Sequence, residues 1–417
     1  TETEGIITGL IVDGEDVTSA QAGDEVEVLV NRTPFYAEGG GQLADHGRIT
    51  LDDGTLVEIS DVQSPVPGLY VHRGRVVSGA LAVGATSVGH VDIERRLAIS
   101  RAHTATHMVH KAFRDVLGET ATQMGSENSP GRFRFDFPSA GAVPASVLAD
   151  VEAQVNAVLI QDLAVSAQIM TQDEARASGA MALFGEKYGD KVRVVSVGDW
   201  ARELCGGTHT ARSGQLGLIK FLSESSVGAG VRRIEALVGS DAYRFMARES
   251  LIVSQLAEMT KTRADELPDR IGKMLDRLKQ AEREIAKART SALLNNLSGL
   301  IGEPTIANGT HVYRFEAPSG TSAGELRDLI TAAKSKVTTS GYVLIGATID
   351  DGKAAVVVTT DSVARDAGVK AQDVLARVLT HLDGRGGGNA EMAQGGGTNT
   401  AALPQAFSAA LDSVSDQ

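Results

Sequence analysis

The segment Arg101–Phe113 has the sequence RAHTATHMVHKAF and places two histidines, His103 and His107, four residues apart. Residues four apart project from the same side of an α-helix, so we expect this segment to be a helix that directs both imidazoles toward one point. His110 lies roughly on the same face, and we interpret it as a supporting or solvated histidine. The segment therefore predicts a helix with one histidine-bearing face.

A second pair of ligand-type residues, Cys205 and His209, follows about a hundred residues later with Gly206, Gly207 and Thr208 between them. Adjacent glycines oppose helix formation and permit a close approach of the backbone, which predicts a tight loop. A lone pair of histidines at this spacing is more often a core or surface feature. The second pair, however, contains the only cysteine of the chain. Since imidazole and thiolate are ligands that zinc prefers, we predict that both pairs bind one Zn²⁺ ion.

The composition is that of an ordinary globular chain. It has 417 residues, of which 42% are hydrophobic and 22% charged, and this length suggests about three domains. No apolar run approaches the roughly 20 residues that span a bilayer, and no signal-peptide pattern opens the chain, so we expect a cytoplasmic protein without a membrane partner. The net charge of -13 argues against indiscriminate nucleic-acid binding but is compatible with a local basic surface.

The first two regions differ in their patterns. Residues 1–92 contain short valine- and isoleucine-rich runs, which predict a β-barrel-like unit. Its expected strands are Gly5–Val12, Val26–Val30, Thr55–Ile59, Leu69–Val77 and Ser87–Val91. Residues 93–239 add helices and predict an α+β core that contains both ligand pairs. Its remaining expected elements are a helix at Pro144–Ile160 and strands at Arg132–Phe137, Val192–Val197, Leu216–Ser223 and Val231–Val238.

Residues 240–302 are charged and poor in glycine, and they predict a helical, coiled-coil-like arm. A helix over Tyr243–Met259 and a break at Arg263–Leu267 precede a second helix with Pro268 in its first turn. We expect the two helices to be antiparallel. The charged face of the second helix is more simply explained by solvation than by RNA contact.

Residues 303–417 alternate strands and helical patterns and predict a small α/β domain. The strands expected there are His311–Glu316, Tyr342–Ile349 and Ala354–Thr359, and the helices are Ser322–Val337, Ala371–Leu382 and Thr400–Val414. Two glycine clusters, at 384–388 and 395–397, predict a loop that exposes backbone amides to a phosphate or ribose, with a mobile loop as the alternative. The clusters match neither the phosphate-binding loop nor the dinucleotide fingerprint.

Four ordered motifs resemble the editing domain of bacterial alanyl-tRNA synthetases. They are RTPFYAEGGGQ at 32–42, HTATH at 103–107, GAMALFGEKY at 179–188 and ELCGGTH at 203–209, and the glycine clusters resemble the C-terminal domain of that family. The resemblance covers essentially the whole chain. It implies hydrolysis of seryl- or glycyl-tRNA(Ala) at a zinc site, with the C-terminal domain binding the tRNA. Since no class II aminoacylation motifs precede the β unit, we expect no aminoacylation from this chain alone.

The same resemblance implies roles for individual residues. Thr33 would hydrogen-bond the serine hydroxyl, and Gln123 and Cys205 would complete the catalytic group. Substrate or tRNA would contact Gly40, Gly41, Gln42, Arg385, Gly386, Gly387 and Gly388. Arg232 and Arg233 follow a flexible glycine segment, and because adjacent strand residues face opposite sides, we expect only one of them to reach a phosphate.

Other functions remain open from the sequence. Four protein ligands close a tetrahedral zinc site, which is the structural rather than the catalytic pattern, so we expect the metal chiefly to shape the pocket. A zinc peptidase needs glutamate after the first histidine, and Thr104 stands there. A non-catalytic module that binds tRNA or forms a homodimer through the arm or C-terminal domain is an alternative. A free-standing editing protein is another, although the absence of an initial methionine favours part of a synthetase.

Overall fold

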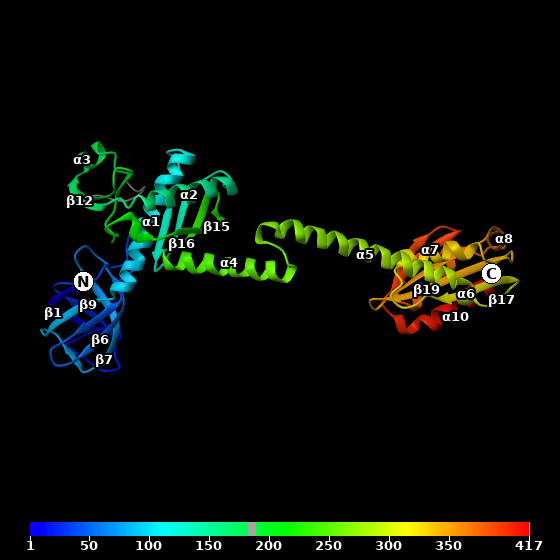
Figure 1. Cartoon of the computed structure of the whole chain (residues 1–417). Coiled ribbons are helices and arrows are strands. Elements are labelled where there is room, and N and C mark those ends of the chain that lie inside the picture. Colours follow the sequence, from blue (N-terminus) through cyan, green and yellow to red (C-terminus); the bar gives the residue numbers. More distant parts are fainter. Residues whose placement is uncertain (182–188, 417) are drawn as a thin grey trace. The chain divides into compact units, whose positions relative to one another are not determined.

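A computed structural model describes residues 1–181 and 189–416 of the chain (Figure 1). The chain divides into two compact units, Thr1–Leu256 and Ala257–Gln417, and each is described by itself. This division is coarser than the four regions expected from the sequence, whose boundaries stay predictions. None of the helices in the described ranges combines the length and apolar character needed to cross a bilayer.

The first unit begins with a closed barrel of six strands in the order β1-β4-β7-β6-β5-β9, in which β9 returns to pair with β1. Residues on alternate positions point into the barrel, where Ile7, Val28 and Val57 are fully buried. The predicted barrel-like unit is confirmed, and β5, which the sequence analysis missed, completes it. Its strands are β1 (Glu2–Val12), β4 (Glu25–Val30), β5 (Gly47–Thr50), β6 (Leu56–Gln63), β7 (Val71–Ser78) and β9 (Thr86–Val91), with the short β2 (Glu15–Val17), β3 (Ser19–Gln21) and β8 (Ala80–Ala82) beside them.

Helix α1 (Ile93–Leu117) follows the barrel and forms the centre of the α+β core. The Asp92 carboxylate accepts a hydrogen bond from the Arg95 amide, which caps the first turn. Apolar residues of α1, Phe113 among them, pack with Phe133, Phe135 and other apolar side chains in one large cluster. His103 and His107 are also buried, so the face of α1 that bears them lies inside the protein.

Two small antiparallel sheets complete the α+β core. Four strands form one sheet, in the order β10 (Gly125–Ser129), β11 (Arg132–Pro138), β16 (Val231–Val238) and β15 (Ile219–Gly228). Three strands form the other, in the order β12 (Val165–Thr171), β13 (Lys191–Val197) and β14 (Ala201–Leu204). The helical elements are α2 (Ala145–Ile160), α3 (Gln172–Ala177) and the 3-10 turn η1 (Ser213–Leu216).

The arm consists of the helices predicted for it. Helix α4 (Ser240–Thr260) is followed by a 3-10 turn, η2 (Ala264–Glu266), and by α5 (Leu267–Asn295), which carries proline in its first turn as expected. Apolar residues of α5, including Met274 and Leu278, are about half exposed, at 47% and 56%. Because α4 and α5 belong largely to different units, their antiparallel packing stays a prediction.

The second unit contains a three-layer α/β domain. Its mixed sheet has the order β17-β18-β19-β20-β22-β21, and only β18 and β19 are parallel. Apolar residues of α9 and α10 pack on one face, and those of α6 and α7 pack on the other. The elements are α6 (Leu297–Ile301), β17 (Thr305–Ala307), β18 (Thr310–Glu316), α7 (Ala323–Lys334), β19 (Tyr342–Asp350), β20 (Lys353–Thr360), α8 (Ser362–Asp366), α9 (Ala371–His381), β21 (Arg385–Gly388), β22 (Met392–Gly397), η3 (Thr400–Ala402) and α10 (Leu403–Ser415).

Candidate metal centre

The fold brings both predicted ligand pairs together. One potential ligand atom from each of His103, His107, Cys205 and His209 lies within 4.8 Å of the others. The Cys205 sulfur is 3.3 Å from Nε2 of His103 and 3.3 Å from Nε2 of His209. The two pairs come from α1 and from the loop after β14, so the cluster depends on how these elements pack.

The Cys205–His209 loop is held by hydrogen bonds with Arg193 on β13. The Cys205 amide donates to the Arg193 carbonyl at 3.0 Å, and the Arg193 guanidinium donates to the carbonyls of Cys205 and Gly207, both at 2.8 Å. A Cβ atom on Gly207 would lie 2.1 Å from Cε1 of His103. The glycine predicted to permit close approach is therefore required at this position, because any side chain would displace a ligand-type imidazole.

Each of the three histidines is oriented through its Nδ1 atom. His103 Nδ1 lies 2.7 Å from Gln42 Oε1, His209 Nδ1 lies 3.1 Å from Thr104 Oγ1, and His107 Nδ1 contacts the Glu203 carboxylate. The Thr208 amide also donates to Gln42 Oε1, at 2.8 Å, so that oxygen is an acceptor and His103 Nδ1 carries the proton. Carboxylate, amide or hydroxyl partners on Nδ1 leave Nε2 for a metal.

The donor set and its unpaired atoms fit a divalent metal ion. His107 Nε2 is buried and has no hydrogen-bond partner among the described residues, although burial normally forces such atoms to pair. Burial acts to raise the pKa of the Cys205 thiol, but the neighbouring histidines outweigh it and lower this pKa to about 2. Burial lowers the pKa of His209 to about 3. Thiolate and neutral imidazole are the forms that bind zinc.

His107 has the opposite tendency because of Glu203. Burial acts to lower the pKa of His107, but the Glu203 carboxylate raises it well above the ordinary value. Burial acts to raise the pKa of Glu203, whereas His107 and then His110 lower it to about 2. The buried carboxylate thus favours positive charge at His107, and a bound dication would supply such charge.

The cluster opens into a cavity of about 400 Å³. Its wall includes His103, His107 and Cys205, and also Gln123, whose amide nitrogen donates to Ser126 Oγ at 3.1 Å. The other lining residues are Tyr36, Gly39, Gly40, Gly189, Lys191, Val192, Arg193, Leu204, Gly206 and Gly207. The structure thus brings Gln123 and Gly40 to the cluster, as the resemblance implies.

The Tyr36 hydroxyl is a polar group of this cavity that the sequence analysis did not select. It donates to the Gly39 carbonyl at 2.9 Å. Burial raises the pKa of Tyr36 to about 12, so the hydroxyl keeps its proton at neutral pH. Tyr36 lies within the RTPFYAEGGGQ motif, which is the signal that could have found it.

Thr33 does not line this cavity. Its hydroxyl lies 2.7 Å from Nε2 of His72 and accepts a hydrogen bond from the Phe35 amide at 3.1 Å. Thr33 instead lines a separate cavity of about 10 Å³, together with His72 and Phe35 and without any of the four ligand-type residues. The structure therefore does not bring Thr33 to the cluster.

Gln42 and Gly41 lie behind the cluster rather than in the wall of its cavity. The Gln42 side chain is fully buried, and its amide nitrogen donates to Thr208 Oγ1 at 2.9 Å. Gly40 and Gly41 adopt φ values of 57° and 77° in the turn before Gln42. A Cβ atom on Gly41 would lie 2.4 Å from Ser126 Oγ. This turn thus fixes Gln42 beside His103.

Arg232 and Arg233 are each paired with a carboxylate from a neighbouring strand. Arg232 Nη2 donates to Glu224 on β15 at 2.6 Å. The Arg233 guanidinium donates to both oxygens of Asp136 on β11, at 2.6 and 2.7 Å. Neither arginine lines the cavity of the cluster. Both charges are therefore compensated within the sheet.

The glycine clusters of the second unit are not a loop, and that prediction was wrong. Residues 385–388 and 392–397 pair as the antiparallel strands β21 and β22. A Cβ atom on Gly386 would lie 2.5 Å from the Gln394 carbonyl oxygen, and one on Gly397 would lie 2.0 Å from the Leu382 carbonyl oxygen. The glycines permit this hairpin to pack closely on itself and on α9, whereas a Cβ on Gly387 would meet nothing within 4 Å.

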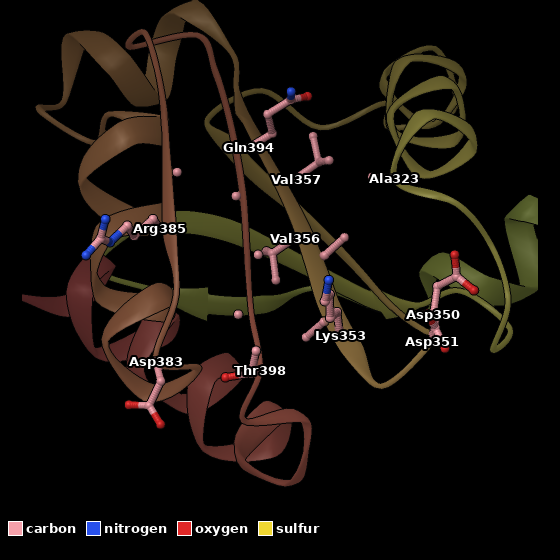
Figure 2. A pocket seen from close by; sticks show the side chains of 16 residues that line it. Ala323, Asp350, Asp351, Lys353, Val356, Val357, Asp383, Arg385, Gln394 and Thr398 are labelled. Carbon is pink, nitrogen blue, oxygen red and sulfur yellow. The ribbon is translucent and has the colours of Figure 1, made fainter. Parts of the chain in front are cut away.

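A groove of about 740 Å³ lies over this hairpin and β20 (Figure 2). Arg385 on β21 and Lys353 at the start of β20 line it, as do Asp350, Asp351 and Asp383. The groove thus carries both signs of charge. Gly386 contributes to the lining, but Gly387 and Gly388 do not.

Comparison with known protein families agrees with the motifs. Three family models match this chain: tRNA synthetases class II (A) at residues 1–95, the threonyl and alanyl tRNA synthetase second additional domain at 192–235, and the DHHA1 domain at 308–416. Alanine–tRNA ligase of Acidothermus cellulolyticus is 55% identical over 415 residues, or 99% of this chain and 47% of that protein. Alanine–tRNA ligase of a Nocardioides species is 53% identical over 407 residues, or 97% of this chain and 45% of that protein.

The chain belongs to the alanyl-tRNA synthetase family. It spans about half the length of the curated relatives it matches. A crystal structure of the C-Ala domain from Aquifex aeolicus alanyl-tRNA synthetase is 26% identical, with a TM-score of 0.25, and the match covers 27% of this chain and 98% of that chain. The family resemblance inferred from the sequence motifs is confirmed. Residues 182–188 of the GAMALFGEKY motif lie outside the described residues.

Proposed function

We propose that this chain hydrolyses the ester of mischarged seryl- or glycyl-tRNA(Ala) at a Zn²⁺ site formed by His103, His107, Cys205 and His209. The observation that carries this proposal is the convergence of four ligand-type atoms beside a cavity of about 400 Å³, whose wall includes His103, His107 and Cys205. The family match and the second additional domain at residues 192–235 support it.

The chain's own residues would act mainly by position. A bound zinc ion supplies a positive charge that polarises an ester carbonyl and lowers the pKa of water. Gln123 and Tyr36 lie in the cavity wall. One amide hydrogen of Gln123 pairs with Ser126, and the other would be donated to a bound aminoacyl ester. The Tyr36 hydroxyl donates its hydrogen to the Gly39 carbonyl, so it would act on the ester as an acceptor. Gly39 and Gly40 let the backbone of the turn approach the ligand without side chains. Such esters are activated, so positioning and polarisation can supply much of the rate enhancement.

To hydrolyse the seryl ester and spare the alanyl ester, the site requires a polar group that hydrogen-bonds the serine hydroxyl. Bound alanine would leave that group unpaired. We propose Gln123 as that group, since it lines the cavity, whereas the Thr33 hydroxyl already contacts His72 outside it. Thr33 would then affect the cavity indirectly, by fixing the backbone of the segment that carries Tyr36. A Thr33→Val protein that loses discrimination while Gln123→Leu keeps it would reverse this assignment.

The second unit would bind the tRNA. Arg385 is exposed on β21, and we propose that it contacts the phosphate backbone beside the groove of Figure 2. The alternative is a module in which zinc is structural and the chain binds tRNA or pairs with a second copy without turnover. A homodimer through the arm or the C-terminal domain is compatible with either function.

One experiment distinguishes these functions. Zinc content is measured together with the hydrolysis of seryl-, glycyl- and alanyl-tRNA(Ala) by the full chain. We expect about one zinc per chain, rapid release of serine and glycine, and slow release of alanine. Binding without turnover would favour the module, and equal rates before and after zinc removal would exclude a role for the metal in hydrolysis.

A further inference from the structure

Glu203 is a fully buried carboxylate that joins two histidines of α1. It lies on β14, two residues before Cys205, and is 1% exposed. One carboxylate oxygen accepts from His107 Nδ1, and the other lies 2.8 Å from His110 Nδ1. Both histidines are also buried, with exposed fractions of 4% and 2%. The carboxylate therefore uses both oxygens on one face of a single helix.

Among the described residues, the His110 side chain forms its hydrogen bond with Glu203. His110 Nε2 is buried and has no partner in the part of the chain that the structure describes. The His110 ring packs against Phe135, with ring centroids 5.4 Å apart. His110 is not one of the four ligand-type residues. Its hydrogen-bonded connection to the cluster therefore runs through the carboxylate.

We propose that Glu203 is the positioning residue of the metal centre and that His110 fixes Glu203 in turn. Glu203 holds the Nδ1 side of His107, so that His107 Nε2 faces the other three ligands. The proposal rests on metal binding by the cluster, which is part of the proposed function, but it does not require that the chain hydrolyse any ester.

The charges of the buried groups agree with this arrangement. Glu203 and a Cys205 thiolate contribute two negative charges beside three neutral imidazoles, and a dication cancels them. A buried carboxylate without this compensation is costly, as is a buried dication with too few anions. Carboxylate–histidine–metal arrangements raise the basicity of the imidazole and fix its ring, and loss of such an outer partner typically lowers metal affinity about 10- to 100-fold.

The test measures zinc affinity by competition with a chelator, on the full chain, for E203A, E203Q, H110L and H110N. We expect E203A to weaken zinc binding about 10- to 100-fold. E203Q keeps the shape and one acceptor, so its effect should be intermediate. H110N places an amide hydrogen near the position of Nδ1 and should bind zinc almost as the unmodified chain does, whereas H110L should weaken binding.

The double variant E203A/H110L separates positioning from general packing. If His110 acts through Glu203, H110L weakens binding in the unmodified chain but adds nothing to E203A. Cobalt in place of zinc gives a second readout, since E203A should alter its visible absorption spectrum through the changed His107 ligand. Thr106→Val is the matched control, because the Thr106 hydroxyl donates to Asn128 at 2.6 Å and, among the described residues, forms no hydrogen bond with any of the four ligand-type side chains. Its zinc affinity should not change.

Two results would overturn the proposal. One is an E203A or E203Q protein, folded by circular dichroism, with unchanged zinc affinity and an unchanged cobalt spectrum. The other is an effect of H110L that adds fully to that of E203A. If E203A fails to fold, the comparison of H110L with H110N and the E203Q titration still decide the question. Zinc affinities that follow the expected order without any ester hydrolysis would refute the proposed function and leave this inference standing.

Discussion

The Cys205–His209 loop and the β21–β22 hairpin both contain adjacent glycines, but the glycines have different surroundings in the two segments. In the loop, Gly207 permits close contact between the backbone and His103, and ligand-type side chains converge nearby. In the hairpin, the glycine backbones pair with each other and pack on α9. The same residue type therefore serves a side-chain cluster in one unit and backbone packing in the other.

The difference lies in which polar atoms are left unpaired. At the cluster, His107 Nε2 is buried without a partner among the described residues, and such an atom is suited to bind a metal ion. In the hairpin, the ladder of β21 and β22 satisfies inward-facing backbone groups. Unpaired buried atoms are thus better evidence for a binding site than glycine density.

Removal of a cluster ligand should give the largest effect. Cys205→Ala deletes the thiolate, and we expect zinc affinity and seryl-tRNA(Ala) hydrolysis to fall by more than the 10- to 100-fold typical of an outer partner. Chelator competition and single-turnover deacylation measure the two effects. Retention of zinc with loss of hydrolysis would show that the thiol does more than bind metal, and no change in either would contradict the site.

Gly207→Ala should give the next effect. Its Cβ would lie 2.1 Å from His103, whereas a Cβ on Gly206 would meet nothing within 4 Å. Overpacking of this kind costs about 1–3 kcal/mol, so we expect zinc affinity to fall about 5- to 150-fold for Gly207→Ala and to be retained for Gly206→Ala. Equal zinc affinities of the two variants would show that the loop is not held against His103.

The sequence predicted secondary structure best where the spacing of residues had the period of a single helix. Both arm helices and the helix bearing His103 and His107 lie where spacing predicted them. Strand β5 was missed because Gly47–Thr50 has only four residues and little apolar pattern. Its pairing with β6 and β9 is a long-range property that closes the barrel.

Other features of the first unit depend on partners from distant parts of the chain. The phosphate contact expected of either Arg232 or Arg233 stays a prediction. The sequence did not predict their carboxylate partners, Glu224 and Asp136, because strand register brings these groups together and the local sequence does not specify it. Glu203 belongs to the ELCGGTH motif, but its pairing with His107 and His110 depends on how β14 packs against α1. Local patterns therefore predicted the ligands better than the groups that orient them.

Gly386→Ala should destabilise the second unit. Its Cβ would lie 2.5 Å from the Gln394 carbonyl oxygen and 2.9 Å from Leu379 Cδ1, and we expect a loss of about 1–3 kcal/mol in the free energy of unfolding. Gly387→Ala is the control, since its Cβ would be in open space. Denaturant titration compares them. Reduced tRNA binding by Gly387→Ala without loss of stability would instead favour a glycine surface that contacts the ligand.

Arg385→Ala should have the smallest effect on stability. Its comparison with Arg233→Ala distinguishes an exposed arginine from one that is paired with a carboxylate. Arg385 is exposed on β21, so its removal should change unfolding free energy by less than about 0.5 kcal/mol while reducing the salt dependence of tRNA(Ala) binding by about one phosphate contact. Arg233→Ala is the comparison. It leaves the Asp136 carboxylate without its bidentate partner and should cost about 1–3 kcal/mol in stability, with little change in the salt slope. A salt slope that changes for Arg233→Ala and not for Arg385→Ala would place the tRNA contact on the first unit's sheet instead of the hairpin.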